Sequence, residues 1–333
     1  MNPRGRVLVT GANGFVGRAV VRQALVRGWA VRAATRIADP ALPAGAEPAF
    51  GLPLSTETDW RPALTGVVAV LHCAARVHVL RDAAADPLAE FRRVNTAGTL
   101  ELARQASEAG VRRFVFVSSI GVNGARTAGA PFTADTPPSP HSPYAIAKHE
   151  AEIGLKRLAT ESGLEVVIVR PPLVYGPAAP GNFARLVRAL QQGWPLPFGA
   201  IHNRRSFVAI DNLVDLLILC LHHAAASEQT FLVSDGEELS TTTLLRRTAQ
   251  ALGQPARLLP VPPTLIRMAA HALGRRELAQ QLLDSLELDI DKTRRLLGWS
   301  PVIGVDAGLR QAVAAPATDA ALAPRPRQGS AST

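Results

Sequence analysis

The first half of the chain alternates short segments rich in β-branched residues with longer amphipathic segments. This alternation is typical of a parallel sheet covered by helices on both faces, because a strand buried on both sides is apolar along its whole length. The expected strands are residues 6–10, 29–35, 67–72, 111–118 and 165–170, and the expected helices are residues 14–27, 87–109 and 143–162. With 333 residues the chain is long enough to bury such a core. The sequence therefore predicts an α/β fold with a doubly wound parallel sheet.

After Pro171 the character of the sequence changes, because proline and glycine become frequent between residues 171 and 199. This punctuation predicts a smaller, mostly helical C-terminal lobe beside the sheet. The expected elements of this part are helices at 182–192, 211–222, 241–252, 263–273 and 276–286 and a strand at 230–233, of which 211–222 and 230–233 return to the main sheet. The last residues, 314–333, are rich in Ala, Pro and Ser without periodicity, and we predict that they are disordered.

A glycine-rich turn joins the first expected strand to the first expected helix. Gly11 would allow a tight turn, Gly14 would let backbone N–H groups approach a pyrophosphate, and Gly17 would permit close packing of helix on strand. The spacing is G-x-x-G-x-x-G, and its position between strand and helix predicts a dinucleotide-binding Rossmann fold, with a purely structural turn as the alternative. The predicted cofactor residues of this turn are Gly11, Asn13, Gly14, Phe15, Val16 and Gly17.

The end of the second expected strand bears on the choice between NAD and NADP. Sites that prefer NAD usually place an acid here to accept a hydrogen bond from the ribose 2′-hydroxyl, whereas this chain has Thr35 and Arg36. Arg36 would pair with a 2′-phosphate, so the sequence mildly favours NADP(H) within an NAD(P) prediction. The alternative is that Arg36 is a solvated loop residue.

Tyr144 and Lys148 form the second signature, Tyr-Ala-Ile-Ala-Lys, on the expected helix 143–162. Ser142 would cap this helix and Pro143 suits its first turn. The i, i+4 spacing places phenol and ammonium on one face of the helix, about one turn apart. A neighbouring ammonium stabilises phenolate, and we therefore expect the phenol pKa to fall from about 10 toward the range of a general acid and base, as hydride transfer at an alcohol carbon requires.

Ser119 follows the expected strand 111–118, at the edge where parallel sheets bind their ligands. Its hydroxyl would form a hydrogen bond with a substrate oxygen beside Tyr144. Ser118 is a competing candidate that spacing alone does not separate, and either serine would also serve as a strand-end cap.

Composition argues against other classes of function. The formal charge is +9, but the arginines are scattered without a basic run or interleaved aromatic residues, so no nucleic-acid partner is predicted. Cys73 and Cys220 are the only cysteines, which gives neither a disulfide framework nor a metal motif, and no metal site is predicted. No apolar run has bilayer length, so no membrane span is predicted. The start of the chain lacks an apolar signal segment, which predicts a cytoplasmic protein.

Taken together, these motifs resemble the extended short-chain dehydrogenase/reductases (SDRs) of the NAD-dependent epimerase/dehydratase family. The resemblance covers about residues 6–308 and depends on TGANGFVG, LHCAA, VNTAGT, SSIGVNG, SPYAIAK and RPPLVYGP. It implies that Ser119 is the catalytic serine beside Tyr144 and Lys148, and that Asn95 orders the active-site backbone. The further cofactor contacts that it implies are Ala74, Ala75, Asn95, Tyr144, Lys148 and Pro171. His72 in such a strand is expected to be structural.

Within this family, 4,6-dehydratases carry an Asp-Glu pair directly after the serine or threonine. This chain has Ile120 and Gly121 there, so the elimination of water loses its acid and base. Arg205 resembles the arginine that contacts the nucleotide diphosphate in members similar to UDP-glucose 4-epimerase, and Asn182 resembles an asparagine with the same role. The alternatives are a surface arginine and a helix cap. The segment PLPFGAIHNRRS is similar to that of UDP-sugar 4-ketoreductases of surface-polysaccharide pathways.

The resulting hypothesis is an NAD(P)-dependent oxidoreductase acting at C4 of a UDP-sugar, as a 4-ketoreductase or 4-dehydrogenase in polysaccharide precursor synthesis. Residues 1–175 would form the dinucleotide-binding domain with 209–235 returning to it, and 176–208 with 236–313 would form the substrate lobe. The alternatives are a UDP-glucose or UDP-N-acetylglucosamine 4-epimerase, which would keep NAD+ bound, a dinucleotide-sensing regulator, and a reductase of a nonsugar carbonyl. The resemblance also implies a homodimer through the helices at 87–109 and 143–162.

Overall fold

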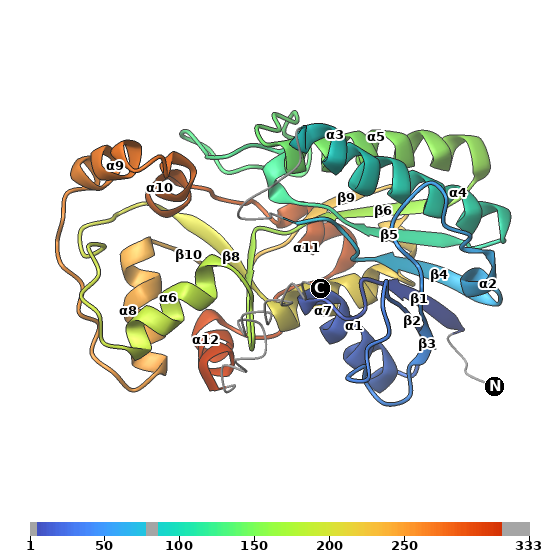
Figure 1. Cartoon of the computed structure of the whole chain (residues 1–333), viewed down its shortest axis with the longest axis horizontal. Helices are drawn as coiled ribbons and strands as arrows, with labels where there is room; N and C mark the ends of the chain where they lie inside the picture. Colours follow the sequence, from blue (N-terminus) through green and yellow to red (C-terminus); the bar gives the residue numbers. More distant parts are fainter. Residues whose placement is uncertain (1–4, 78–85, 315–333) are drawn as a thin grey trace, which may run out of the picture.

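The computed structural model describes residues 5–77 and 86–314. Its larger part is a seven-stranded sheet in the order β3-β2-β1-β4-β5-β6-β9, in which every neighbouring pair is parallel (Figure 1). The strands are β1 (Arg6–Thr10), β2 (Ala30–Ala34), β3 (Glu47–Ala49), β4 (Val67–His72), β5 (Arg113–Val117), β6 (Glu165–Arg170) and β9 (Thr230–Leu232). This architecture confirms the predicted doubly wound α/β fold.

Strand β1 shows why the sheet is covered on both faces. Val7 and Val9 point into one apolar core, whereas Leu8 between them points into a second core on the opposite face, and all three are fully buried. In the view of Figure 1, helices α1 (Phe15–Val26) and α7 (Ile210–Cys220) lie below the sheet, and α4 (Thr99–Glu108) and α5 (Pro143–Ser162) lie above it. The shorter helical segments of this part are α2 (Arg61–Leu64), α3 (Pro87–Phe91), η2 (Ile120–Val122), η3 (Ala224–Ala226) and α11 (Asp291–Leu297).

The expected helix 87–109 is not one continuous α-helix. Between α3 and α4 the chain forms a π-helix, η1 (Arg92–Gly98), which contains Asn95. Such segments are rare and occur frequently at functional sites. The capped start of α5 agrees with the prediction, since Ser142 Oγ accepts a hydrogen bond from Ala145 N at 3.2 Å and Pro143 is the first helical residue.

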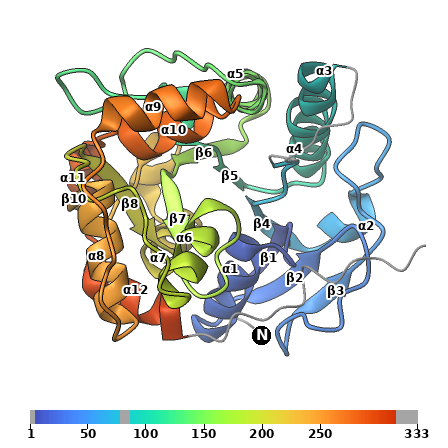
Figure 2. The same ribbon diagram turned by 60° about the vertical axis from the view of Figure 1, so that its left-hand side comes forward.

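A second, smaller lobe lies at the left of Figure 1, and Figure 2 turns this lobe forward. Its helices are α6 (Asn182–Gln191), α8 (Thr241–Ala251), α9 (Pro263–Ala272), α10 (Arg276–Leu283) and α12 (Val305–Ala314). A three-stranded sheet of β7 (Leu173–Tyr175), β8 (Arg205–Ala209) and β10 (Glu238–Leu239) was not expected from the sequence; β8 pairs parallel with β7 and antiparallel with β10. The predicted disordered tail lies outside the described residues except for Ala314, which ends α12. None of the helices in residues 5–77 and 86–314 has the length and apolar character needed to cross a bilayer.

Asp235, which follows β9, connects the two sheets. Its carboxylate accepts hydrogen bonds from the Tyr175 hydroxyl at 2.7 Å, from Ala209 N at 2.8 Å and from Asn212 Nδ2 at 2.7 Å. These partners lie on β7, at the end of β8 and on α7, and all are buried. A buried carboxylate is stable only with such partners, so this residue fixes how the small sheet sits on the large one.

Replacement of Tyr175 by Phe tests this connection. Tyr175 is 1% exposed, and the change removes one hydrogen bond to a buried carboxylate without opening a cavity. We expect the free energy of unfolding to fall by about 1.5–3 kcal/mol, as is typical for a hydrogen bond to a charged group. Urea denaturation measures this loss, and an unchanged unfolding midpoint would contradict the assigned role.

Candidate active site

The predicted cofactor residues gather at the carboxyl edge of the large sheet, around β1 and β4. These neighbouring strands mark the point where the strand order reverses, which is where doubly wound sheets bind their ligands. The glycine turn leaves β1 at this point and leads into α1, while the loop after β4 carries Ala74 and Ala75.

The glycine turn has no room for side chains at two of its positions. Gly11 has a φ of +63°, and a Cβ at this residue would lie 2.9 Å from Ala74 N. A Cβ at Gly17 would lie 2.1 Å from the carbonyl oxygen of Gly11. The turn therefore packs directly against α1 and the loop after β4, as the spacing predicted.

The amino end of α1 suits an anionic ligand. Gly14 precedes the helix without a side-chain cap, and the first turn contains no acidic residue. The first N–H groups of a helix lack partners within the helix, and they lie at the positive end of its dipole. Together with the exposed Asn13 and Gly14, this turn fits the pyrophosphate of a dinucleotide.

Asn95 holds the loop after β4 in place, as the resemblance implied. Its Oδ1 accepts from Arg76 N at 2.7 Å and its Nδ2 donates to Arg76 O at 2.9 Å, and the side chain is fully buried in the π-helix. His72 is structural, since its ring is fully buried between the hydroxyls of Thr10 and Thr99, at 2.7 and 3.0 Å. Burial and the charge of Lys148 hold the pKa of His72 well below its usual value.

Tyr144 and Lys148 lie one turn apart on α5, with the Lys148 Nζ 6.0 Å from the centroid of the Tyr144 ring. Lys148 is 1% exposed and donates to the carbonyl of Val117 at 2.9 Å, at the end of β5. Its ammonium also lies 4.5 Å from the centroid of the Phe116 ring. Tyr144 is half-buried, and the ring of Phe91 meets it edge-on with centroids 6.0 Å apart.

The expected lowering of the phenol pKa is wrong for this structure. Burial raises the pKa of Tyr144 to about 12 and lowers the pKa of Lys148 to about 8, because an apolar surrounding disfavours the charged form of either group. The charge of Glu152 acts in the opposite direction on Lys148. The ammonium of Lys148 is directed to a carbonyl and an aromatic ring of β5.

The structure distinguishes the two adjacent serines. Ser118 is 3% exposed, and its hydroxyl donates to Glu152 Oε1 at 2.5 Å, so that hydroxyl is held inside the protein. Ser119 is half-buried and precedes η2, where its Oγ accepts from Gly121 N at 3.1 Å. This bond uses only the oxygen of Ser119 and leaves its hydrogen for another acceptor.

The residues after β2 differ in their exposure. Thr35 is 2% exposed, and its hydroxyl donates to Ile37 O at 2.7 Å, whereas Arg36 is exposed. Asp39, which the sequence analysis missed, forms an ion pair with Arg18 of α1 at 2.6 Å. The two partners are 21 residues apart in the sequence and meet only because the fold brings the loop after β2 beside α1, so spacing alone did not reveal the pair.

The predicted substrate residues belong to the second lobe, and both contact the segment that ends α10. Arg205 donates to the backbone carbonyl of Asp284 at 2.8 Å, and burial lowers the pKa of its guanidinium to about 10. Asn182 Nδ2 donates to Gln281 Oε1 at 2.8 Å. Asn182 is not a helix cap, since Gly181 occupies that position without a side-chain bond.

The loop between Ser119 and Tyr144 links the two lobes. Thr127 N donates to Ser285 O at 2.9 Å, and Phe132 N donates to Glu287 O at 2.8 Å. The same strand-like segment, 285–289, lies beside the start of β8 through Leu286 and Arg205. Segment 285–289 therefore contacts both the loop between Ser119 and Tyr144 and the residue predicted to bind the diphosphate, Arg205. Pro171 is buried at the end of β6, where its carbonyl accepts from Ile120 N at 2.9 Å.

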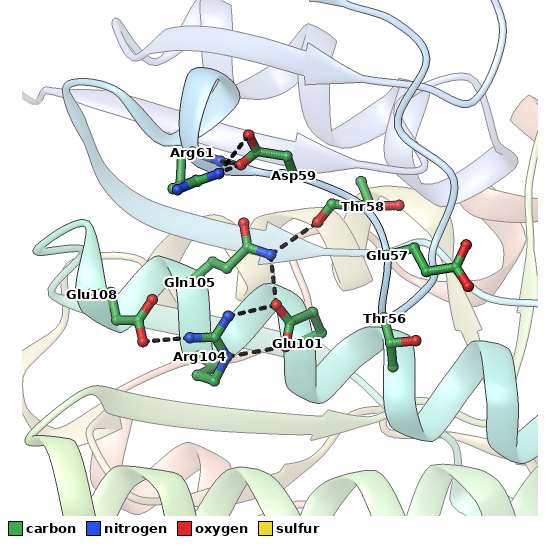
Figure 3. A pocket seen from close by; sticks show the side chains of 9 residues that line it. All are labelled: Thr56, Glu57, Thr58, Asp59, Arg61, Glu101, Arg104, Gln105 and Glu108. Atoms are coloured by element: carbon green, nitrogen blue, oxygen red, sulfur yellow. Dashed lines mark hydrogen bonds and ion pairs between the residues drawn. The ribbon is translucent and has the colours of Figure 1, made fainter.

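A surface cleft of about 400 Å³ lies beside α4, and none of the predicted site residues lines it (Figure 3). Its charged side chains pair with one another, as Arg61 with Asp59 at 2.7 Å and Arg104 with Glu101 at 2.6 Å. Within residues 5–77 and 86–314, no group of three or more His, Cys, Asp or Glu side chains is placed to hold a metal ion.

Comparisons with known proteins agree with the geometry. The family model described as "NAD dependent epimerase/dehydratase family" matches residues 7–234. A UDP-glucose 4-epimerase of Vibrio cholerae is 42% identical over 312 residues, covering 92% of this chain and 93% of the relative. A UDP-glucose 4-epimerase of Mycolicibacterium smegmatis is 30% identical over 326 residues, which are 92% of this chain and 97% of the relative.

Among solved structures, a short-chain dehydrogenase/reductase superfamily protein of Agrobacterium tumefaciens with bound NAD has a TM-score of 0.72 and 26% identity, covering 93% of this chain and 96% of that protein. The UDP-glucose 4-epimerase of Thermotoga maritima has a TM-score of 0.75 and 23% identity, covering 93% and 97%, and so shares the fold.

The fold and the Tyr-Lys centre define an NAD(P)-dependent enzyme of the extended SDR type. The chain belongs to the NAD-dependent epimerase/dehydratase family, as its sequence motifs implied.

Replacement of Gly17 by Ala tests the glycine turn. Because the added methyl would overlap the Gly11 carbonyl, the turn must move away from α1. We expect NAD(P) binding to weaken by about tenfold or more, a loss of about 1.4 kcal/mol, measured by quenching of protein fluorescence during titration. Gly304→Ala is the control, since nothing lies within 4 Å of a Cβ at that position. Equal affinities for the two variants would contradict the role of Gly17.

Proposed function

We propose that this protein transfers hydride between NAD(P) and C4 of a UDP-linked sugar. The observation that carries the proposal is the placement of Tyr144 and Lys148 one turn apart, with Lys148 bound to the end of the strand that precedes Ser119. The relatives in V. cholerae and M. smegmatis, both named UDP-glucose 4-epimerase, support a UDP-sugar as the substrate. A 4,6-dehydratase would lack its acid and base here, because Ile120 and Gly121 supply neither.

Three side chains would perform the proton chemistry at the sugar oxygen. Tyr144 would exchange the proton of the 4-hydroxyl or 4-keto oxygen, and Ser119 would position that oxygen through its free hydroxyl hydrogen. Lys148 would orient the nicotinamide ribose. The nicotinamide of bound NAD(P) would supply the hydride donor and acceptor.

The cofactor contacts would come from the glycine turn and the loop after β4. The first turn of α1 would hold the pyrophosphate, and Asn95 binds the backbone of Arg76, directly after Ala74 and Ala75. Arg36 is exposed, where it would meet a 2′-phosphate, and on this ground we retain the prediction of NADP(H). The paired Asp39 lies in the same loop and favours NAD.

Arg205 would bind the diphosphate of the substrate. A guanidinium this deeply buried is costly, and its hydrogen bond to a neutral carbonyl leaves its charge available for an anion. Asn182 would contact the same diphosphate from the start of α6. A reductase of a nonsugar carbonyl would have no use for this charge, although a relative 32% identical over 271 residues is named sterol demethylase protein B.

The direction of the reaction separates two candidates. The Thr35-Arg36 pair favours a 4-ketoreductase with dissociable NADPH, whereas the 42% identical relative favours a UDP-hexose 4-epimerase. An epimerase retains nicotinamide through purification and interconverts UDP-glucose and UDP-galactose without added cofactor. A reductase consumes added NADPH with a UDP-linked 4-keto sugar. The homodimer through 87–109 and 143–162 and the cytoplasmic location remain predictions of the same proposal.

Tyr144→Phe tests the proton donor. Without the hydroxyl we expect kcat to fall by about 10²–10⁴-fold, while NAD(P) affinity is retained. The matched control is Tyr175→Phe, which alters the other of the two tyrosines and should lower stability but not kcat. Undiminished activity of Tyr144→Phe would contradict the catalytic role and favour a dinucleotide-sensing regulator.

Arg205→Ala tests the substrate class. We expect the KM for a UDP-sugar to rise by about tenfold to a hundredfold with little change in the affinity for NAD(P), since the lost contact binds the substrate alone. Arg204→Ala is the control, because Arg204 is exposed and paired with Glu287 at 2.7 Å. Steady-state kinetics measure both variants, and an unchanged KM for Arg205→Ala would favour a substrate without a diphosphate.

A further inference from the structure

A buried ionic cluster lies directly behind the reaction centre. Glu152 and Arg170 have side chains only 2% and 3% exposed and meet through two hydrogen bonds, Nε to Oε1 at 2.9 Å and Nη2 to Oε2 at 2.5 Å. Ser118 donates to the same carboxylate at 2.5 Å, and His149 Nδ1 lies 4.0 Å from it. Arg170 Nη1 donates to Asn123 Oδ1 at 2.9 Å. Every member of this cluster adjoins a segment that carries the site.

The cluster connects α5, the end of β5 and the end of β6, which must keep their relative positions during the reaction. Glu152 lies one turn after Lys148 on α5, Ser118 immediately precedes Ser119, and Arg170 ends β6. A movement of α5 along its axis would break the contacts with both β5 and β6. At the site itself, α5 also contacts the end of β5 through the hydrogen bond from Lys148 Nζ to Val117 O at 2.9 Å.

Another ion pair lies away from the site and joins β5 to β6. Arg113 and Glu165 pair at the amino ends of these strands, with Arg113 Nε donating to Glu165 Oε2 at 2.7 Å. Arg113 and Glu165 lie at the opposite ends of the two strands from Ser119. None of their side-chain hydrogen bonds reaches a residue of α5. Buried ion pairs contribute little net stability, because desolvation offsets their attraction. The Arg113–Glu165 pair therefore serves as a control for the Glu152–Arg170 pair, because the two differ in their distance from the site.

We propose that Glu152, held by Arg170 and Ser118, is a positioning residue of the reaction centre: it fixes α5, with Tyr144 and Lys148, against the end of β5 that carries Ser119. This inference rests on the proposed function for the identity of the catalytic residues. Glu152 touches neither the substrate nor the cofactor in this role and acts through Lys148 and Ser119.

The charge of Glu152 also acts on the ammonium of Lys148. Burial would raise the pKa of Glu152, but the polar contacts with His149, Arg170 and Ser118 outweigh burial and lower that pKa to about 2. Burial lowers the pKa of Lys148 to about 8, and the carboxylate of Glu152, which remains ionised at neutral pH, acts in the opposite direction. The other groups that face Lys148 are His72 of β4, which is held neutral, and the phenol of Tyr144.

Glu152→Gln is the main variant, and Ser118→Ala is the milder one, because it removes a single hydrogen bond from the cluster. Glu165→Gln is the matched control at the other ends of the same strands. We expect kcat with a UDP-sugar to fall by about tenfold or more in Glu152→Gln, with KM nearly unchanged, because misplaced catalytic groups slow the chemical step. Ser118→Ala should show a smaller loss of kcat, and Glu165→Gln should show none.

Nuclear magnetic resonance (NMR) gives a readout that does not depend on the substrate. The chain has three lysines and two tyrosines, so isotope-labelled Lys and fluorinated Tyr give few signals. The Lys148 signal should titrate below the usual range of a lysine in the wild type and still lower in Glu152→Gln, since a negative charge is lost and Arg170 remains. The Tyr144 signal should shift in Glu152→Gln and in Ser118→Ala, but not in Glu165→Gln.

The kinetic and the NMR measurements together distinguish a failure of this inference from a failure of the proposed function. Equal losses of kcat in Glu152→Gln and Glu165→Gln, or an unchanged titration of Lys148 together with an unchanged Tyr144 signal, would overturn the positioning role. If the Glu152 variant does not fold, an unshifted Tyr144 signal in Ser118→Ala overturns it equally. A wild-type protein inactive on every UDP-sugar contradicts the proposed function, while the NMR arm still decides the role of Glu152.

Discussion

The carbonyl of Gly11 occupies the space in which any side chain at residue 17 would begin, and the rest of the site follows from this contact. It brings the first turn of α1 onto β1 and leaves the amino end of the helix open to an anion. The same turn presses against Ala74, whose loop is fixed by Asn95. A dinucleotide bound here would extend along the carboxyl ends of β1, β4 and β5 toward α5.

The second constraint is burial, which acts on the charged forms of Tyr144 and Lys148. Lys148 is almost completely buried, and the carbonyl of Val117 and the face of the Phe116 ring surround its ammonium. Burial makes both the ammonium and the phenolate costly, which explains the opposite directions of their pKa changes. Behind them, the carboxylate of Glu152 is held in a fixed, buried position by Arg170 and Ser118.

Much of the fold was predictable because local rules and the global fold agree. Val7, Leu8 and Val9 are apolar in succession because β1 is buried on both faces, and Ser142 with Pro143 marks the start of α5. The small sheet was missed because β7 and β10 are three and two residues long, too short for a periodic pattern. The π-helix around Asn95 was missed because a helical pattern does not reveal which turn is widened. The pKa of Tyr144 and the contact between Glu152 and Arg170 depend on tertiary burial, which spacing along the chain does not contain.

The account places hydride transfer at C4 of the sugar, and isotopic labelling tests this most directly. The protein is incubated with NAD+ and a UDP-sugar that carries deuterium at C4 alone, and the nicotinamide is then analysed by mass spectrometry. Hydride transfer from C4 predicts that deuterium appears on the nicotinamide ring, either in released cofactor or in the bound cofactor when the reaction is stopped with acid. A reduced nicotinamide without deuterium, or loss of the label to solvent while product forms, would contradict it.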